Sequence, residues 1–257
     1  MRLSLPLALV AILGLLGPLG PLAGCSANKA ELQQEKLNAD QALDHFERAS
    51  QMADRGELKE AIREFARAVR LDPEFAAAWY GLGNQLRRAD QIEDAVEAWK
   101  RAITADPKLI QAYNNLGVAY TTLGQPDKAI VVLRRATRLD PGYARAWSSL
   151  GGAYDALGEH TRAVITLKEG LEIDPHSADL WRNLGTAYAH QKLWKESIDA
   201  YAQATRFDPN DAETRFNFGM TLIQAGQPKG AYEQLDALKT LDPARANQLR
   251  QMLGLTG

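Results

Sequence analysis

Apolar and polar positions along the chain recur with a fixed period of 34 residues. The clearest marker is an Asp-Pro pair that appears six times at this spacing, with prolines at Pro73, Pro107, Pro141, Pro175, Pro209 and Pro243. Small residues keep the same step, in a row of glycines from Gly83 to Gly219 and a row of mostly alanines from Ala61 to Ala231. A constant period in this range predicts a stacked array of equivalent structural units.

Each period predicts two antiparallel helices joined by a short turn. Glycine suits the left-handed turn after the first helix because it lacks a Cβ atom, and it stands there at Gly56, Gly124, Gly158 and Gly226. Asp90 and Lys192 occupy the same point in two other periods, so we expect strain of roughly 1 kcal/mol at Lys192. The Asp of each Asp-Pro pair ends the second helix, since a residue before proline disfavours the helical conformation.

The rows of small residues allow the two helices of a unit to approach closely. A row of large aromatic side chains fills the remaining space, and we interpret it as core rather than ligand contact: Trp79, Tyr113, Trp147 and Trp181.

The 34-residue unit resembles the tetratricopeptide repeat. The stretch AYNNLGVAYTTLGQPDKAIVVLRRATRLDP matches nearly every position of that family's aromatic, Leu-Gly, Tyr, Ala and Pro signature. The resemblance implies an all-α fold, a right-handed α-solenoid of helix-turn-helix repeats. We place six repeats at 42–75, 76–109, 110–143, 144–177, 178–211 and 212–245, and a C-terminal capping helix at 246–257. Leu249, Met252 and Leu253 would form the apolar side of that cap.

The N-terminus has the pattern of a secretory signal peptide: one charge, Arg2, then an apolar run and small residues. A transmembrane helix is the alternative, but it needs about 20 apolar residues, and this stretch is broken by prolines and glycines. Leu22-Ala23-Gly24-Cys25 resembles the lipobox of bacterial lipoproteins. The resemblance implies a signal peptide at 1–24, fatty acylation of Cys25 and, with Ser26 rather than Asp next, the outer membrane facing the periplasm. Residues 25–41 would be the acylated cysteine and a tether, or a helical extension of the first repeat.

Composition and motifs argue against catalysis. The formal net charge is −2, which gives no sign of nucleic-acid binding. The four histidines, His45, His160, His176 and His190, lack metal-ligand spacing and fall at unrelated positions of the repeat. Every glycine is explained by the repeat or the leader, so no phosphate-binding loop remains. We therefore expect neither an enzyme, nor a cofactor, nor a metal site.

Binding is the expected activity, because stacked repeats build a long concave surface. In tetratricopeptide proteins the first helix of each repeat lines that surface. The resemblance implies a protein-binding groove that includes Tyr80, Asn84, Arg87, Arg88, Asn114, Asn115, Arg145, Arg182, Asn183 and Asn217.

Two features of this groove suggest a partner. Asn115, Asn183 and Asn217 share one repeat position, and an asparagine ladder can hold the backbone of an extended peptide. The alternative is ordinary asparagine on an exposed helix. The four arginines would form a basic centre for an acidic segment or a C-terminal carboxylate. Chance scatter of surface charge is the alternative.

The whole plan resembles tetratricopeptide lipoproteins of the cell envelope, and most of all the pilotins of type IV pilus assembly, which assist a secretin in the outer membrane. That resemblance implies a non-catalytic, membrane-anchored scaffold whose groove binds envelope proteins. Two alternatives stay open: an adaptor for peptidoglycan hydrolases or proteases, and a self-assembling structural protein. The oligomeric state is not determined.

Overall fold

The structure, a computed structural model, describes residues 22–255, with side chains from residue 29 onward. It confirms the all-α prediction: the described chain forms thirteen helices and no strand. The predicted signal peptide lies almost wholly outside the described residues, as does the side chain of Cys25. The helices are α1 (Leu22–Asp54), α2 (Leu58–Leu71), α3 (Ala76–Arg88), α4 (Ile92–Ala105), α5 (Ile110–Thr122), α6 (Pro126–Leu139), α7 (Ala144–Ala156), α8 (His160–Ile173), α9 (Ala178–His190), α10 (Trp194–Phe207), α11 (Ala212–Gln224), α12 (Pro228–Leu241) and α13 (Pro243–Met252).

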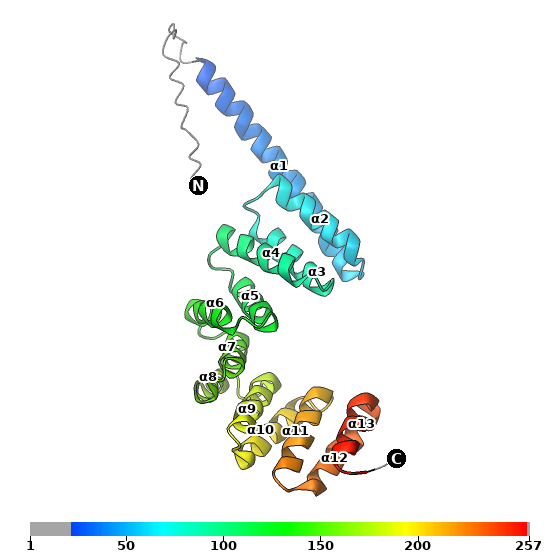
Figure 1. Ribbon diagram of the computed structural model, residues 1–257. Helices are drawn as coiled ribbons and strands as arrows, with labels where there is room; N and C mark the ends of the chain where they lie inside the picture. Colours follow the sequence, from blue (N-terminus) through cyan, green and yellow to red (C-terminus); the bar gives the residue numbers. More distant parts are fainter. Residues whose placement is uncertain (1–21, 256–257) are drawn as a thin grey trace, which may run out of the picture.

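Successive helices pair into repeats that stack in a curved row (Figure 1). First helices contact one another from repeat to repeat, as α5 does with α7 and α7 with α9. Their partners, such as α6 and α8, stand on the outer side of the curve (Figure 1). Because the inner row is packed more closely than the outer row, the first helices line the concave face.

The Asp-Pro pair builds the turn between repeats. Each Asp is the C-cap of a second helix, and its side chain accepts a hydrogen bond from the backbone N–H two residues later. The carbonyl of the following proline accepts a further bond from the aromatic row, at 2.8 Å from Nε1 of Trp79, Trp147 and Trp181. These half-buried indoles therefore pack against the core and also clamp the turn.

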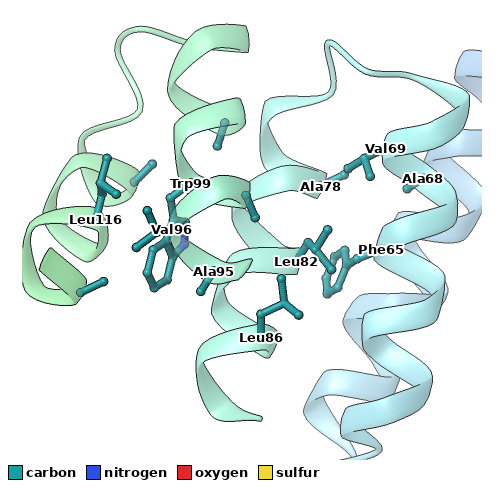
Figure 2. Packing of buried hydrophobic residues seen from close by; sticks show 14 of the residues in the cluster. Phe65, Ala68, Val69, Ala78, Leu82, Leu86, Ala95, Val96, Trp99 and Leu116 are labelled. Carbon is teal, nitrogen blue, oxygen red and sulfur yellow. The ribbon is translucent and has the colours of Figure 1, made fainter. Parts of the chain in front are cut away.

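The two helices of a repeat approach each other closely at the glycine row. A Cβ atom on Gly83 would lie 2.6 Å from Nε1 of Trp99, and one on Gly151 would collide with Leu167. Trp99 and Leu167 are fully buried. Figure 2 shows Trp99 and Phe65 projecting between helices of the first three repeats, within the cluster that also holds Leu82 and Leu116.

The two ends of the stack differ from its middle. Residues 26–41 lie in α1, which runs on as one helix into the first repeat. At the other end α13 begins at Pro243, N-capped by Asp242, and covers the last repeat with the buried side chain of Leu249. Met252, expected on the apolar side of the cap, is instead 45% exposed. Among the described helices, none is long and apolar enough to cross a membrane.

Two turns confirm the expected strain. Lys192 has a φ of 59° and Asp90 a φ of 61°, whereas their counterparts in the other repeats include Gly124 and Gly158, with φ of 67° and 84°. A side chain is disfavoured in this conformation by roughly 1 kcal/mol.

The glycine row yields a test with a built-in control. Gly151→Ala should lower the free energy of unfolding by about 1–3 kcal/mol, because the new methyl group must displace the buried Leu167 side chain. Gly152→Ala, one residue along the same helix, meets its nearest atom at 3.8 Å and should instead stabilise by up to about 1 kcal/mol through helix propensity. Urea unfolding followed by circular dichroism measures both. Equal midpoints for the two variants would contradict this packing.

Candidate binding surface

The first helices of neighbouring repeats contact each other with a constant offset in sequence. Side-chain hydrogen bonds join residue i of one repeat to residue i+35 of the next: Tyr80 to Asn115, Asn114 to Ser149, Ser148 to Asn183, and Asp155 to His190. The Arg88 guanidinium reaches the carbonyl of Ala53 across the same step. The groove is therefore a surface whose polar side chains are partly used to hold the repeats together.

The asparagines illustrate this internal use. Asn115 donates from Nδ2 to Oδ1 of Asn84 at 2.8 Å, and the same oxygen accepts from Nε1 of the buried Trp99 at 3.2 Å. Asn183 donates from Nδ2 to the hydroxyl of Ser148 at 3.0 Å. Asn114 is 3% exposed, so it lies beneath the groove surface. Of the ladder positions, Asn217 alone makes no side-chain hydrogen bond to another described residue.

The four arginines of the expected basic centre are placed differently from one another. Arg87 and Arg145 are exposed, and Arg88 is exposed but also hydrogen-bonded to Gln85. Arg182 lies among three carboxylates, at 2.9 Å from Asp179, 3.5 Å from Asp211 and 3.8 Å from Glu213.

The environment of Asp211 shows what Arg182 does. Burial by itself would raise the pKa of Asp211, but the Thr214 hydroxyl and the charge of Arg182 hold that pKa below its usual value. Arg182 therefore stabilises the packing of α9 against α11. The neighbouring carboxylates largely neutralise its charge within the chain.

A hollow of about 200 Å³ opens in the concave face between α9 and α11. Hydroxyl, amide and thioether groups line it, from Thr186, Asn217, Thr221, Met220 and Gln224. The Tyr201 ring forms part of its wall, and its hydroxyl lies 2.9 Å from that of Thr186. Burial raises the pKa of Tyr201 to about 12, so the phenol is neutral at physiological pH.

A larger hollow, of about 580 Å³, lies between the second helices α8 and α10. Its floor is apolar, from Leu171, Trp181 and Leu184, and acidic side chains stand at its edge, including Glu172 and Glu196. The resemblance implied a groove lined mainly by first helices, so this cavity beside the second helices was not among the predicted binding surfaces.

The spacing of the histidines gave no sign of a metal-ligand cluster, but the structure brings two of them together. His160 and His190 face each other with ring centroids 4.9 Å apart, and both direct Nδ1 at the carboxylate of Asp155. The 34-residue period did not indicate this cluster, because Asp155 and His190 are 35 residues apart, one more than the period. Asp155 and His160 lie on the two sides of the turn between α7 and α8. A search at the i+35 spacing would have paired the first two.

Comparison with known proteins supports the repeat assignment. Family profiles described as "TPR repeat" match residues 49–86 and 83–124, and profiles described as "Tetratricopeptide repeat" match 120–184 and 178–211. Together they span more than half of the chain. No curated protein sequence matches it.

Solved structures share the fold over most of the chain. MamA is 25% identical, with a TM-score of 0.59 over 68% of this chain and 95% of its own. YrrB, described as "a TPR protein with an unusual peptide-binding site", is 24% identical, with a TM-score of 0.58 over 72% and 92%. PilF of Pseudomonas aeruginosa is 15% identical, with a TM-score of 0.67 over 83% and 98%.

The shared acceptor at Asn84 can be tested by truncation. Asn84→Ala should cost about 1–3 kcal/mol, because the buried Trp99 N–H loses its acceptor and Asn115 loses one of its own. Asn217→Ala, at a ladder position without such bonds to described residues, should change stability by less than about 0.5 kcal/mol. Thermal unfolding of both variants measures the difference. An Asn84→Ala variant as stable as Asn217→Ala would show that the asparagines do not link the repeats.

Proposed function

The chain belongs to the tetratricopeptide repeat family, and from that premise we propose that it is a non-catalytic scaffold anchored to a bacterial membrane. Its concave face binds an extended segment of another envelope protein. The observation that carries this proposal is the hollow between α9 and α11, a part of the groove with room for a ligand side chain.

The chemistry of this hollow suits a peptide. The Asn217 amide offers both a donor and an acceptor to a peptide backbone, and Met220 offers an adaptable apolar contact. Since the amides of Asn115 and Asn183 are engaged between repeats, recognition centres on α9 and α11 rather than on a ladder along the whole groove. YrrB, a member of the same fold, is described as binding a peptide, which supports this use of the surface.

The N-terminal residues support the anchor. The lipobox ends at Cys25, within the first turn of α1, and the same helix continues to the first repeat at Ala42. At about 1.5 Å per residue the part of this helix from Cys25 to Ala42 spans about 25 Å. A triacylated cysteine at its start would hold the groove at a defined height above the outer membrane, facing the periplasm.

The client that we propose is an outer-membrane assembly such as a type IV pilus secretin. The order of parts supports it: a lipobox, a helical spacer and six repeats resemble the plan of the pilotin lipoproteins. PilF of Pseudomonas aeruginosa shares the fold over 98% of its own length, and this likeness concerns the fold alone.

Site-specific cross-linking tests the groove and its client. A photoreactive residue in place of Met220 should form adducts with a secretin in the native envelope, because its side chain lines the hollow. The same residue in place of Val131, which is 68% exposed on the second helix α6, is the matched control and should form few adducts. Equal labelling from both positions would contradict groove binding. Adducts with a peptidoglycan hydrolase or with a second copy of the chain would replace the secretin as the client.

Substitution of the cysteine tests the anchor independently. Cys25→Ala should abolish labelling by a radioactive fatty acid and leave the leader uncleaved, because no thiol remains to be acylated. Ser26→Asp is the control: it should keep the label and shift the protein from the outer to the inner membrane fraction. Normal processing of Cys25→Ala, with release of the mature chain, would disprove the lipobox.

A further inference from the structure

Three side chains to which the proposed function assigns no role converge where repeats four and five meet, and one of them, His190, also lines the groove hollow. Asp155 lies near the end of α7, His160 begins α8 and His190 ends α9. We propose that these three residues bind one divalent transition-metal ion of the zinc class. This inference goes beyond the proposed function and does not depend on the identity of the client.

The geometry is close to that of a metal site. Nδ1 of His160 lies 2.7 Å from Oδ1 of Asp155, and Nδ1 of His190 lies 3.0 Å from both oxygens of that carboxylate. One ligand atom from each residue falls within 4.8 Å of the other two. Ligands of tetrahedral Zn²⁺ at 2.0–2.1 Å stand about 3.3 Å apart, so the two distances between imidazole and carboxylate need to lengthen by roughly 0.3–0.6 Å. The half-exposed His190 side chain is free to make that movement.

The donor set indicates the class of metal. Two imidazole nitrogens and one carboxylate favour Zn²⁺, Co²⁺, Ni²⁺ or Cu²⁺ over Mg²⁺ and Ca²⁺, which prefer oxygen ligands. Because an ionised carboxylate only accepts hydrogen bonds, these contacts require that each Nδ1 carries a proton in the metal-free protein. Metal binding moves each proton to Nε2, so neutral imidazoles bind the ion without a net loss of protons. Three protein ligands leave a fourth position open, and His190 also lines the groove hollow.

The repeat architecture does not require these residues. At the positions equivalent to Asp155, His160 and His190 one period earlier, the chain has Thr121, Pro126 and Ala156, and the same turn forms there. Pro228 occupies the position of His160 in the last repeat. The cluster is therefore an addition to the repeat rather than part of its structure.

The surrounding helix ends favour a cation. The C-terminal turns of α7 and α9 carry Asp155 and His190, and the helix dipole gives each of these ends a partial negative charge. One N-terminus, that of α8, opposes them. The acidic neighbour Glu159 is paired with Arg162 at 2.7 Å, so it adds little net charge.

Isothermal titration of the full chain in detergent with ZnCl₂ tests the site. Cys25 is replaced by Ala in every sample so that no thiol contributes. We expect one zinc ion per chain, a rise in melting temperature that grows with zinc concentration, and visible absorption bands of tetrahedral geometry when Co²⁺ is used instead. Asp155→Thr and His190→Ala introduce the residues of the preceding repeat and should weaken binding by at least about tenfold. His176→Ala removes a histidine outside the cluster and should leave affinity unchanged.

Each outcome decides the proposal. Circular dichroism checks that each variant folds in the absence of metal. If one of them does not fold, His160→Pro replaces it in the titration, because proline already occupies the equivalent position at Pro126 and Pro228. No zinc binding by the parent chain, or equal affinity in Asp155→Thr, His190→Ala and His176→Ala, would overturn the proposal. In that case the cluster is a hydrogen-bond network that only joins the two repeats.

Discussion

The contact on which the rest of the structure depends is that between the backbone of the first helix and a large side chain of the second helix in repeats two to five. Trp99, Leu133, Leu167 and Tyr201 each press against a glycine 16 residues earlier in the chain, where a Cβ atom would collide. This approach sets the distance between the two helices of a repeat. Because the same contact recurs from repeat to repeat, small and equal rotations add up to the curved stack of Figure 1.

The concave face has two roles, to hold neighbouring repeats together and, as proposed, to bind a partner. Its first helices hold neighbouring repeats in register through hydrogen bonds between polar side chains, which removes several asparagines and Arg182 from the surface offered to a partner. The groups that remain available to a partner are distributed unevenly along the groove. They are a polar hollow on α9 and α11 and the exposed arginines on α3 and α7. The proposed recognition and the assembly of the repeats therefore use different parts of one groove.

The proposed anchor, spacer and groove form one mechanical unit because α1 is a single helix. A flexible tether would let the groove sample a range of heights, whereas a helix from Cys25 into the first repeat restricts both height and orientation. The histidine cluster adds a local constraint of the same kind, since an ion bound there would join α7, α8 and α9. Both features would position a binding surface rather than carry out chemistry.

The sequence by itself determined everything that repeats: the helix pairs, the Asp-Pro turns, the glycine and alanine rows, and strain at Lys192. These are local or periodic, because each repeat meets the same neighbours and must solve the same packing problem. Only the tertiary structure decided which side chains meet between repeats. Adjacent first helices are offset by one residue, so Asp155 faces His190 rather than Ala189, and Asn115 meets Tyr80. That offset comes from how one repeat sits on the next, and the 34-residue period contains no record of it.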